Sequence, residues 1–264
     1  MLLLVLGVCF HGVSHANACS FKSPVSTRIT FCDNSASIAF EVTSSGEITG
    51  GAEGVQNNSG GSISTFTNAG SINGTSYGVK NNSGAAIGVL SNTGTITGGT
   101  AGIFNAGVIT TINNKQGASG SALTYTGILP VNYNIIINSP SDFGKLSVAS
   151  PSGSTIFGIY AGSTVADGTY SSVLSGLTLS HLSVTSGTYG AGTWSLLNSS
   201  GSVWDLVLSG FTLPPIDIGP GDTVALSSVG TTANPVLSGG TLTTLNGEAS
   251  SLAFSVPVSS TIMA

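Results

Sequence analysis

Few side chains in this chain could carry out catalysis. Of its three histidines, His11 and His15 lie in an apolar N-terminal segment, and only His181 lies in the body of the sequence. A serine-histidine-aspartate site needs a histidine as its base, but His181 falls in the alternating stretch LTLSHLSV, which indicates a polar position on a β-strand. No G-x-S-x-G motif occurs either. We therefore expect no catalytic residue, and we expect that the chain is not an enzyme.

The acidic residues do not form a recognisable catalytic or metal site. Glu41, Glu47 and Glu53 are spaced six residues apart, a spacing that does not place two carboxylates on one face as glycoside hydrolases require. We interpret these acids as edge charges that discourage pairing between sheets. Zinc spacing is missing because His181 is the only histidine outside the apolar N-terminal segment, and the repeated GGxGxD calcium loop does not occur. The sequence predicts neither a metal nor a cofactor.

Composition excludes one class of partner and favours one class of fold. The 264 residues include ten acidic and five basic side chains, and only 6% of the chain is charged. Nucleic-acid binding needs a concentrated basic patch, so we exclude nucleic acid as a partner. The chain contains 38 glycines, and serine, threonine and asparagine fill most of its polar positions. All four residue types form helices poorly, so the composition predicts a nearly all-β protein.

Residues 1–18 have the pattern of a secretory signal peptide. An apolar run extends to about Val13 and is followed by Ala16-Asn17-Ala18, a small-x-small cleavage pattern. This run is shorter than the roughly 20 residues that a membrane-spanning helix needs. No lysine or arginine precedes it, which departs from the usual pattern. A lipoprotein signal, with Cys19 directly after the cleavage site, is the competing interpretation.

Cleavage at this position leaves two cysteines, Cys19 and Cys32, which lie close together in the sequence. An even pair in a secreted chain predicts a disulfide that closes an N-terminal loop. According to the loop-closure argument, this disulfide would stabilise the fold by roughly 3 kcal/mol. Two unpaired thiols are the alternative.

An internal repeat dominates the sequence from Ser44 to Asn114. Three units, residues 44–67, 68–91 and 92–114, can be written beneath one another, and the third has a deletion in its second half. The coinciding positions include Ile48, Ile72 and Ile96, then Val55, Val79 and Ile103, and finally Asn57, Asn81 and Asn105. One unit alone could not bury its apolar residues, whereas stacked units form a continuous core. The repeat therefore predicts a right-handed parallel β-helix, a β-solenoid with about 24 residues in each coil.

The asparagine series has a structural interpretation and a functional one. At the corner of a coil, asparagine tolerates left-handed backbone angles and hydrogen-bonds nearby backbone groups. Stacked asparagine amides also hydrogen-bond to one another as a ladder, so we predict a structural ladder of Asn57, Asn81 and Asn105. The functional alternative is that these asparagines line a ligand groove.

Changes in the pattern divide the chain into five segments. The signal peptide occupies residues 1–18, an N-terminal cap follows at 19–43, and the β-helix repeats cover 44–122. Residues 123–213 contain longer alternating runs and both tryptophans, which indicate a separate β-rich region. The stretch LPPIDIGPGD interrupts the alternation. We therefore expect residues 214–264 to contain a linker and the truncated start of further β repeats.

Several of these features together resemble the passenger domains of Gram-negative autotransporters, which use type V secretion. The resemblance rests on the signal peptide, the N-x-G-x-I coils, and the stretches TYTGILPVNYNIIINSPSDFGKL, FGIYAGSTVADGTYSSVLSG and SGSVWDLVLSG. The stretch SGGTL near Gly239 is similar to the start of the repeat that often precedes the translocator in such proteins.

This resemblance implies a secreted or cell-surface protein that is associated with the outer membrane. It implies an outer-membrane β-barrel translocator as a partner, either downstream in a longer gene product of which this chain is a fragment, or encoded elsewhere. Because histidine, arginine and paired acids are scarce, we expect a non-enzymatic passenger, a stalk or adhesin that binds a host or neighbour-cell ligand on its solenoid surface. Two alternatives stay open: an enzymatic passenger whose catalytic module lies outside this chain, and a secreted structural protein without a barrel partner.

Overall fold

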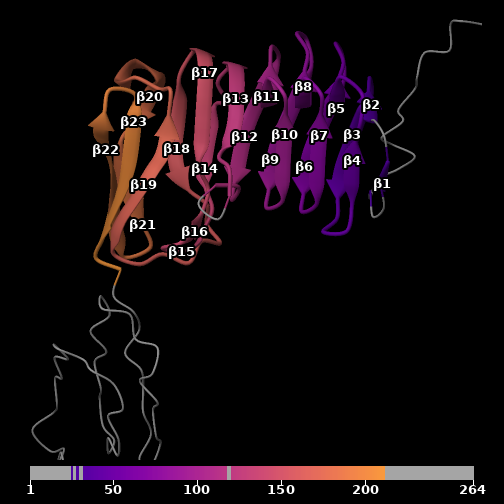
Figure 1. The fold of residues 1–264 in the computed structure, drawn as a ribbon. Helices are drawn as coiled ribbons and strands as arrows, with labels where there is room; N and C mark the ends of the chain where they lie inside the picture. Colours follow the sequence, from indigo (N-terminus) through magenta and orange to yellow (C-terminus); the bar gives the residue numbers. More distant parts are fainter. Residues whose placement is uncertain (1–24, 26–27, 30–31, 118–119, 212–264) are drawn as a thin grey trace, which may run out of the picture. The chain divides into compact units, whose positions relative to one another are not determined.

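The computed structural model describes Val25 and residues 28–29, 32–117 and 120–211 (Figure 1). Almost every element in these residues is a β-strand, and the single exception is the short 3-10 helix η1 (Leu179–His181). The expectation of a nearly all-β protein is confirmed. The predicted segments 1–18 and 214–264 lie outside the described residues.

The strands form three main sheets. Four parallel strands make the first sheet: β1 (Arg28–Ile29), β4 (Glu47–Thr49), β7 (Ser71–Gly74) and β10 (Thr95–Gly98). Seven parallel strands make the second: β3 (Ser37–Val42), β6 (Ser62–Asn68), β9 (Ala86–Asn92), β12 (Val108–Asn114), β14 (Asn132–Ile135), β18 (Thr155–Ile159) and β20 (Leu182–Val184). Ten strands make the third, in the spatial order β2 (Cys32–Asn34), β5 (Glu53–Asn57), β8 (Tyr77–Asn81), β11 (Ala101–Asn105), β13 (Leu123–Ile128), β17 (Leu146–Ser152), β19 (Gly168–Ser175), β23 (Val203–Ser209), β22 (Gly192–Ser200) and β21 (Ser186–Tyr189). A small antiparallel pair, β15 (Ile137–Ser139) and β16 (Asp142–Phe143), stands apart from them.

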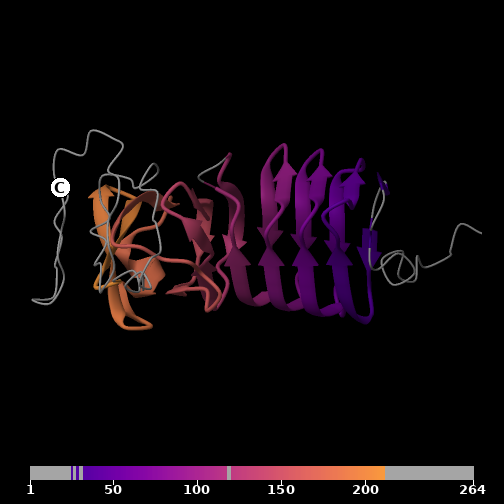
Figure 2. The ribbon, with the colours of Figure 1, turned by 90° about the horizontal axis from the view of Figure 1, so that it is seen from below.

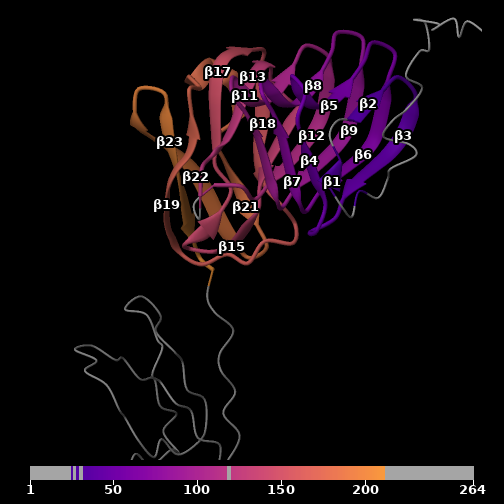
Figure 3. The ribbon, with the colours of Figure 1, turned by 45° about the vertical axis from the view of Figure 1, so that its right-hand side comes forward.

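Each coil of the repeat contributes one strand to each of the three sheets. The first complete coil contains β4, β5 and β6, the second β7, β8 and β9, and the third β10, β11 and β12. Equivalent strands pair in parallel, with Ile48 opposite Ile72 and Ile72 opposite Ile96. The coils are therefore stacked along one axis, as Figures 2 and 3 show. The predicted parallel β-helix, with its coil length of about 24 residues, is confirmed.

The interior of the stack is built from apolar residues that lie directly above one another. Val55, Val79 and Ile103 are register partners on the ten-stranded sheet, and all three are fully buried. Two further buried series lie on the seven-stranded sheet: Ile63, Ile87 and Ile109, and Phe66, Leu90 and Ile112. Burying one such side chain stabilises the fold by roughly 1.5–3 kcal/mol, and only the stacking of coils makes this burial available.

The coils extend beyond the recognisable repeat. β13 pairs with β11, and β14 pairs with β12, both in parallel. The β-rich region that the sequence indicated after residue 122 therefore continues two of the sheets directly. The four-stranded sheet behaves differently, because its last strand within the described residues is β10.

The side chain of Gln116 lies at the open edge of β10. Gln116 Oε1 accepts a hydrogen bond from the Ile96 N–H at 2.8 Å, and Gln116 Nε2 donates to the Ile96 carbonyl at 3.3 Å. This single amide occupies the place that the peptide group of a further strand would take. It satisfies two backbone groups that would otherwise be unpaired, and so it ends the sheet.

The last strands convert the parallel stack into an antiparallel sheet. β19 pairs in parallel with β17 on one side and antiparallel with β23 on the other, and β22 and β21 follow as hairpin strands. Aromatic side chains fill the interior here, with ring centroids 5.3 Å apart for Phe157 and Trp194. Trp204 Nε1 donates to the Leu177 carbonyl at 2.8 Å. These large buried side chains account for the longer alternating runs in this part of the sequence.

The predicted N-terminal cap, residues 19–43, contributes a partial coil. Its strands β1, β2 and β3 pair in parallel with β4, β5 and β6. Cys32 lies in β2 opposite Val55, whereas Cys19 lies outside the described residues. The disulfide between the two cysteines therefore stays a prediction.

Candidate functional site

Asn57, Asn81 and Asn105 form a hydrogen-bonded ladder inside the solenoid. Each residue ends a strand of the ten-stranded sheet, and each is fully buried. Asn57 Nδ2 donates to Asn81 Oδ1, and Asn81 Nδ2 donates to Asn105 Oδ1, both at 2.8 Å. Asn34 extends the ladder at one end, and Asn105 ends it by donating to the Ile128 carbonyl at 2.7 Å. Because none of these amides is exposed, they do not line a ligand groove.

A second buried ladder runs along the end of the seven-stranded sheet. Asn68 Nδ2 donates to Asn92 Oδ1 at 2.8 Å. Asn92 Nδ2 then donates to Asn114 Oδ1 at 3.1 Å and to Gln116 Oε1 at 3.2 Å. Asn68 Oδ1 has no hydrogen-bond partner within the described residues, because Val42 takes the equivalent position in the preceding coil. Sequence reasoning missed this ladder, although Asn68 and Asn92 open successive repeat units.

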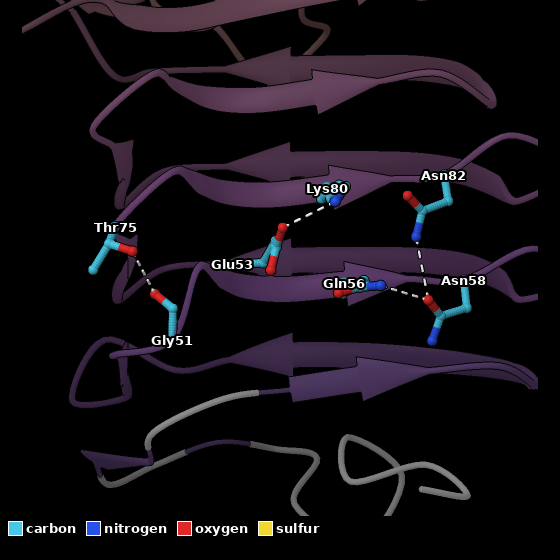
Figure 4. Close-up of polar contacts among 7 residues, drawn as sticks. All are labelled: Gly51, Glu53, Gln56, Asn58, Thr75, Lys80 and Asn82. Atoms are coloured by element: carbon cyan, nitrogen blue, oxygen red, sulfur yellow. Dashed lines mark hydrogen bonds and ion pairs between the residues drawn. The ribbon is translucent and has the colours of Figure 1, made fainter. Parts of the chain in front are cut away.

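The side chains that could meet a ligand lie on the outer face of the ten-stranded sheet. Here β5, β8 and β11 alternate buried residues such as Val79 with partly exposed ones such as Lys80. We define the aromatic–amide patch as seven partly exposed residues of this face: Glu53, Gln56, Asn58, Tyr77, Lys80, Asn82 and Phe104. Figure 4 shows its polar members, which come from two successive coils.

An ion pair and two aromatic rings form the centre of the aromatic–amide patch. Lys80 Nζ lies 3.0 Å from Glu53 Oε1 and 6.0 Å from the centroid of the Tyr77 ring. The Tyr77 and Phe104 ring centroids are 5.0 Å apart, and the two ring planes are inclined at 34°. The ion pair is partly buried, with exposed side-chain fractions of 28% for Lys80 and 14% for Glu53. The two charges therefore compensate each other, and both side chains keep a part of their surface that a ligand can reach.

Side-chain amides border the aromatic–amide patch where β5 and β8 end. Gln56 Nε2 donates to Asn58 Oδ1 at 2.7 Å, and Asn82 Nδ2 donates to the same oxygen at 3.2 Å (Figure 4). Asn58 Nδ2 in turn donates to the Asp33 carboxylate. This row of polar groups crosses three coils at the surface, in contrast to the two ladders inside.

The residues considered for catalysis are not brought together. Glu41, Glu47 and Glu53 lie on β3, β4 and β5, which belong to three different sheets, so their carboxylates do not share a face. The predicted strand position of His181 is wrong. His181 ends the 3-10 helix η1, and its Nδ1 accepts a hydrogen bond from the Thr178 N–H at 3.1 Å. The chain turns at this point, and strand β20 begins only at Leu182.

Two buried tyrosines belong to the interior as well. Burial raises the pKa of the Tyr125 and Tyr133 hydroxyls well above the usual range of tyrosine. Tyr125 Oη donates to the Ile128 carbonyl, and Tyr133 Oη accepts a hydrogen bond from Asn114 Nδ2 at 3.3 Å. Both hydroxyls therefore stay neutral and serve the hydrogen bonding of the core.

The C-terminal hairpin strands carry a second surface feature. An open hollow of about 440 Å³ lies over β21, β22 and β23, and it is lined by Ser186, Gly187, Thr188, Thr193, Trp194, Ser195, Val207 and Ser209. None of these side chains is charged. The part of the chain that the structure describes contains no group of three or more His, Cys, Asp and Glu side chains that could hold a metal. The aromatic–amide patch, which combines ring faces, amides and a carboxylate, is therefore the stronger candidate site.

Comparisons with known proteins give no relative for this chain: no family model, no curated protein and no solved structure matches it. Among residues 25–211, so far as they are described, no helix has the length and apolar character needed to cross a membrane. The function has to be inferred from the residues of this chain.

Proposed function

We propose that this chain is a non-enzymatic passenger segment of the autotransporter type, which is secreted and presented at the surface of a Gram-negative bacterium. It acts as a structural stalk and as an adhesin-type binding element. The observation that carries this proposal is the continuous stacking of coils, since the seven-stranded sheet runs through about six successive turns of the solenoid. A solenoid of this kind presents long outer faces to its surroundings, which suits a stalk that binds.

The distribution of polar groups also supports a role in support and binding. The fully buried asparagines hydrogen-bond within the stack, so each coil is tied to the next by side chains as well as by backbone. Each coil contacts mainly its neighbours, and stability therefore accumulates along the stack. The aromatic–amide patch is on the outside, where a ligand can reach it.

The proposal includes an outer-membrane translocator as the partner that exports the chain. This partner is encoded either downstream in the same gene or separately. Residues 1–18 would direct the first step, export across the inner membrane, and would be removed after Ala18.

Surface exposure in a Gram-negative host tests the proposal. The whole reading frame is expressed, and antigen from residues 32–211 is followed after protease is added to intact cells. We expect the mature chain to begin at Cys19 and to be accessible to the protease or released into the medium, while a cytoplasmic marker stays intact. The variant Ala18→Arg should accumulate as an uncleaved, protected precursor. A wild-type chain that keeps residues 1–18 and stays protected inside the cell would contradict the proposal.

A further inference from the structure

Outward positions of the ten-stranded sheet form a continuous series across five coils. The register partners on β2, β5, β8, β11 and β13 are Asp33, Gln56, Lys80, Phe104 and Thr126. Neighbouring members of the series are separated by the strand spacing, about 4.8 Å. One pyranose ring in a linear oligosaccharide advances by a similar length. A linear sugar chain laid along the solenoid axis would therefore meet one coil with each of its rings.

Two members of the aromatic–amide patch, Tyr77 and Phe104, pack against each other as one aromatic pair. The centroids of Tyr77 and Phe104 are 5.0 Å apart, and their planes are inclined at only 34°, so the rings are closer to parallel than to perpendicular. The face of an aromatic ring carries partial negative charge, and the C–H bonds of a sugar ring carry partial positive charge. At this distance and inclination the two rings overlap, so each covers part of one face of the other. The part of the pair that stays exposed is an apolar surface on which a sugar ring can pack.

The polar groups around the rings match a ligand with many hydroxyls. Carboxylates accept hydrogen bonds and side-chain amides both donate and accept, and the patch supplies Glu53 and the amides of Gln56, Asn58 and Asn82. The charges are compensated: Lys80 is paired with Glu53 at 3.0 Å, and the Asp33 carboxylate accepts a hydrogen bond from Asn58. A patch whose cation is already paired favours an uncharged ligand over an anionic one.

We propose that the aromatic–amide patch binds a linear, uncharged oligosaccharide that lies along the solenoid axis with one sugar ring on each coil. This inference rests on the proposed binding function and adds the chemical class of the ligand. A sugar ring packs on the exposed side of the Tyr77–Phe104 pair, while Glu53 and the neighbouring amides hydrogen-bond the sugar hydroxyls. The hydroxyl-lined hollow on β21–β23 is the rival location.

Isothermal titration calorimetry of the full chain with cellohexaose, maltohexaose and chitohexaose tests this proposal. We expect at least one hexasaccharide to bind with a dissociation constant below about 1 mM, and its disaccharide to bind at least about tenfold more weakly because it spans fewer coils. Phe104→Ala and Tyr77→Ala should each lower the affinity at least about tenfold. Tyr77→Phe, which keeps the ring face, should retain most of the affinity.

Two variants at exposed threonines serve as matched controls. Thr97→Ala alters the four-stranded sheet, and Thr193→Ala alters the hollow. Both should leave the affinity unchanged, and circular dichroism is used to check that each variant is folded. The proposal would be overturned if none of the three hexasaccharides bound at millimolar concentration, or if Phe104→Ala bound as well as the parent. The proposal would also be overturned if the disaccharide and the hexasaccharide bound with equal affinity, or if Thr193→Ala were the only variant that lowered the affinity.

The two proposals fail in distinguishable ways. A chain that reaches the cell surface but binds no hexasaccharide would contradict the ligand class and leave the passenger role standing. A chain that binds a hexasaccharide but stays protected inside the cell would contradict the passenger role and support the binding site.

Discussion

Replacing Asn81 by alanine removes the middle member of the first asparagine ladder. Asn81 Oδ1 accepts a hydrogen bond from Asn57 at 2.8 Å, and Asn81 Nδ2 donates to Asn105 at 2.8 Å and to the Val108 carbonyl at 3.2 Å. Asn57 keeps its hydrogen bonds to the Gly61 and Ala86 carbonyls, and Asn105 keeps those with the Gly107 N–H and the Ile128 carbonyl, so neither amide is left without a partner. The variant loses three buried hydrogen bonds. At about 1 kcal/mol for each bond, we expect it to lose about 2–4 kcal/mol of unfolding free energy in total.

Urea unfolding followed by far-ultraviolet circular dichroism measures this loss. Asn82→Ala is the matched control, because it changes the same residue type at the next position, where the side chain is partly exposed and donates to Asn58 at 3.2 Å. We expect the control to lose no more than about 0.5 kcal/mol. Equal unfolding midpoints for the two variants would refute the assignment of Asn81 to a stabilising internal ladder.

Three further predictions concern the interior. Ile72→Asp places a carboxylate in a fully buried series, and we expect the thermal midpoint to fall by more than about 10 °C; a melting curve like that of the parent would show that Ile72 does not face inward. Gln116→Ala removes both hydrogen bonds to Ile96, so amide exchange at Ile96 should accelerate while that at Ile72 stays slow, and equal rates in variant and parent would contradict the edge assignment. Burial raises the pKa of Tyr125 and Tyr133 above the ordinary 10.0, so these hydroxyls lose their protons at a lower pH in the unfolded state than in the folded state. The free energy of unfolding is therefore unaffected below pH 10 and decreases as the pH rises above it. Ultraviolet titration should show these two tyrosines ionising after the exposed ones, and Tyr133→Phe should weaken the decrease; an unchanged pH dependence in that variant would contradict the argument.

The repeat made the interior predictable because stacked positions constrain one another. Ile48, Ile72 and Ile96 recur since each packs on its equivalent in the next coil, and the asparagines recur since each amide needs an amide above and below it. The second ladder was equally readable in principle from Asn68 and Asn92. The continuation of this ladder to Asn114 could not be predicted from the sequence. Asn114 follows Asn92 by fewer residues than one repeat unit, so it does not fall at the equivalent position of the repeat.

The exterior was not predictable in the same way. Gln56, Lys80 and Phe104 occupy one outward series on the ten-stranded sheet, and outward side chains need not resemble their neighbours. The aromatic–amide patch therefore gives no periodic signal, and only the register of the strands brings Tyr77 and Phe104 together.

Beyond the repeat, backbone pairing replaces sequence similarity. Parallel strands are joined through N–H and C=O groups that almost every residue supplies, so β13 continues the stack without resembling β11. A lone glutamine that ends a sheet, as Gln116 does, leaves no pattern at all. The alternation around His181 was misleading because Thr178 and His181 hydrogen-bond to each other across a single helical turn.

Spin labels at positions 49 and 97 test the stacking of the coils most directly. Thr49 and Thr97 are outward residues of one series on the four-stranded sheet, with Asn73 between them. Stacking places their Cα atoms two strand spacings apart, about 9.6 Å, although two whole repeat units separate them in the sequence. With the native cysteines replaced by serine, we predict strong dipolar broadening of the electron paramagnetic resonance spectrum of the doubly labelled protein. A spectrum equal to the sum of the two singly labelled spectra would contradict the stacked solenoid.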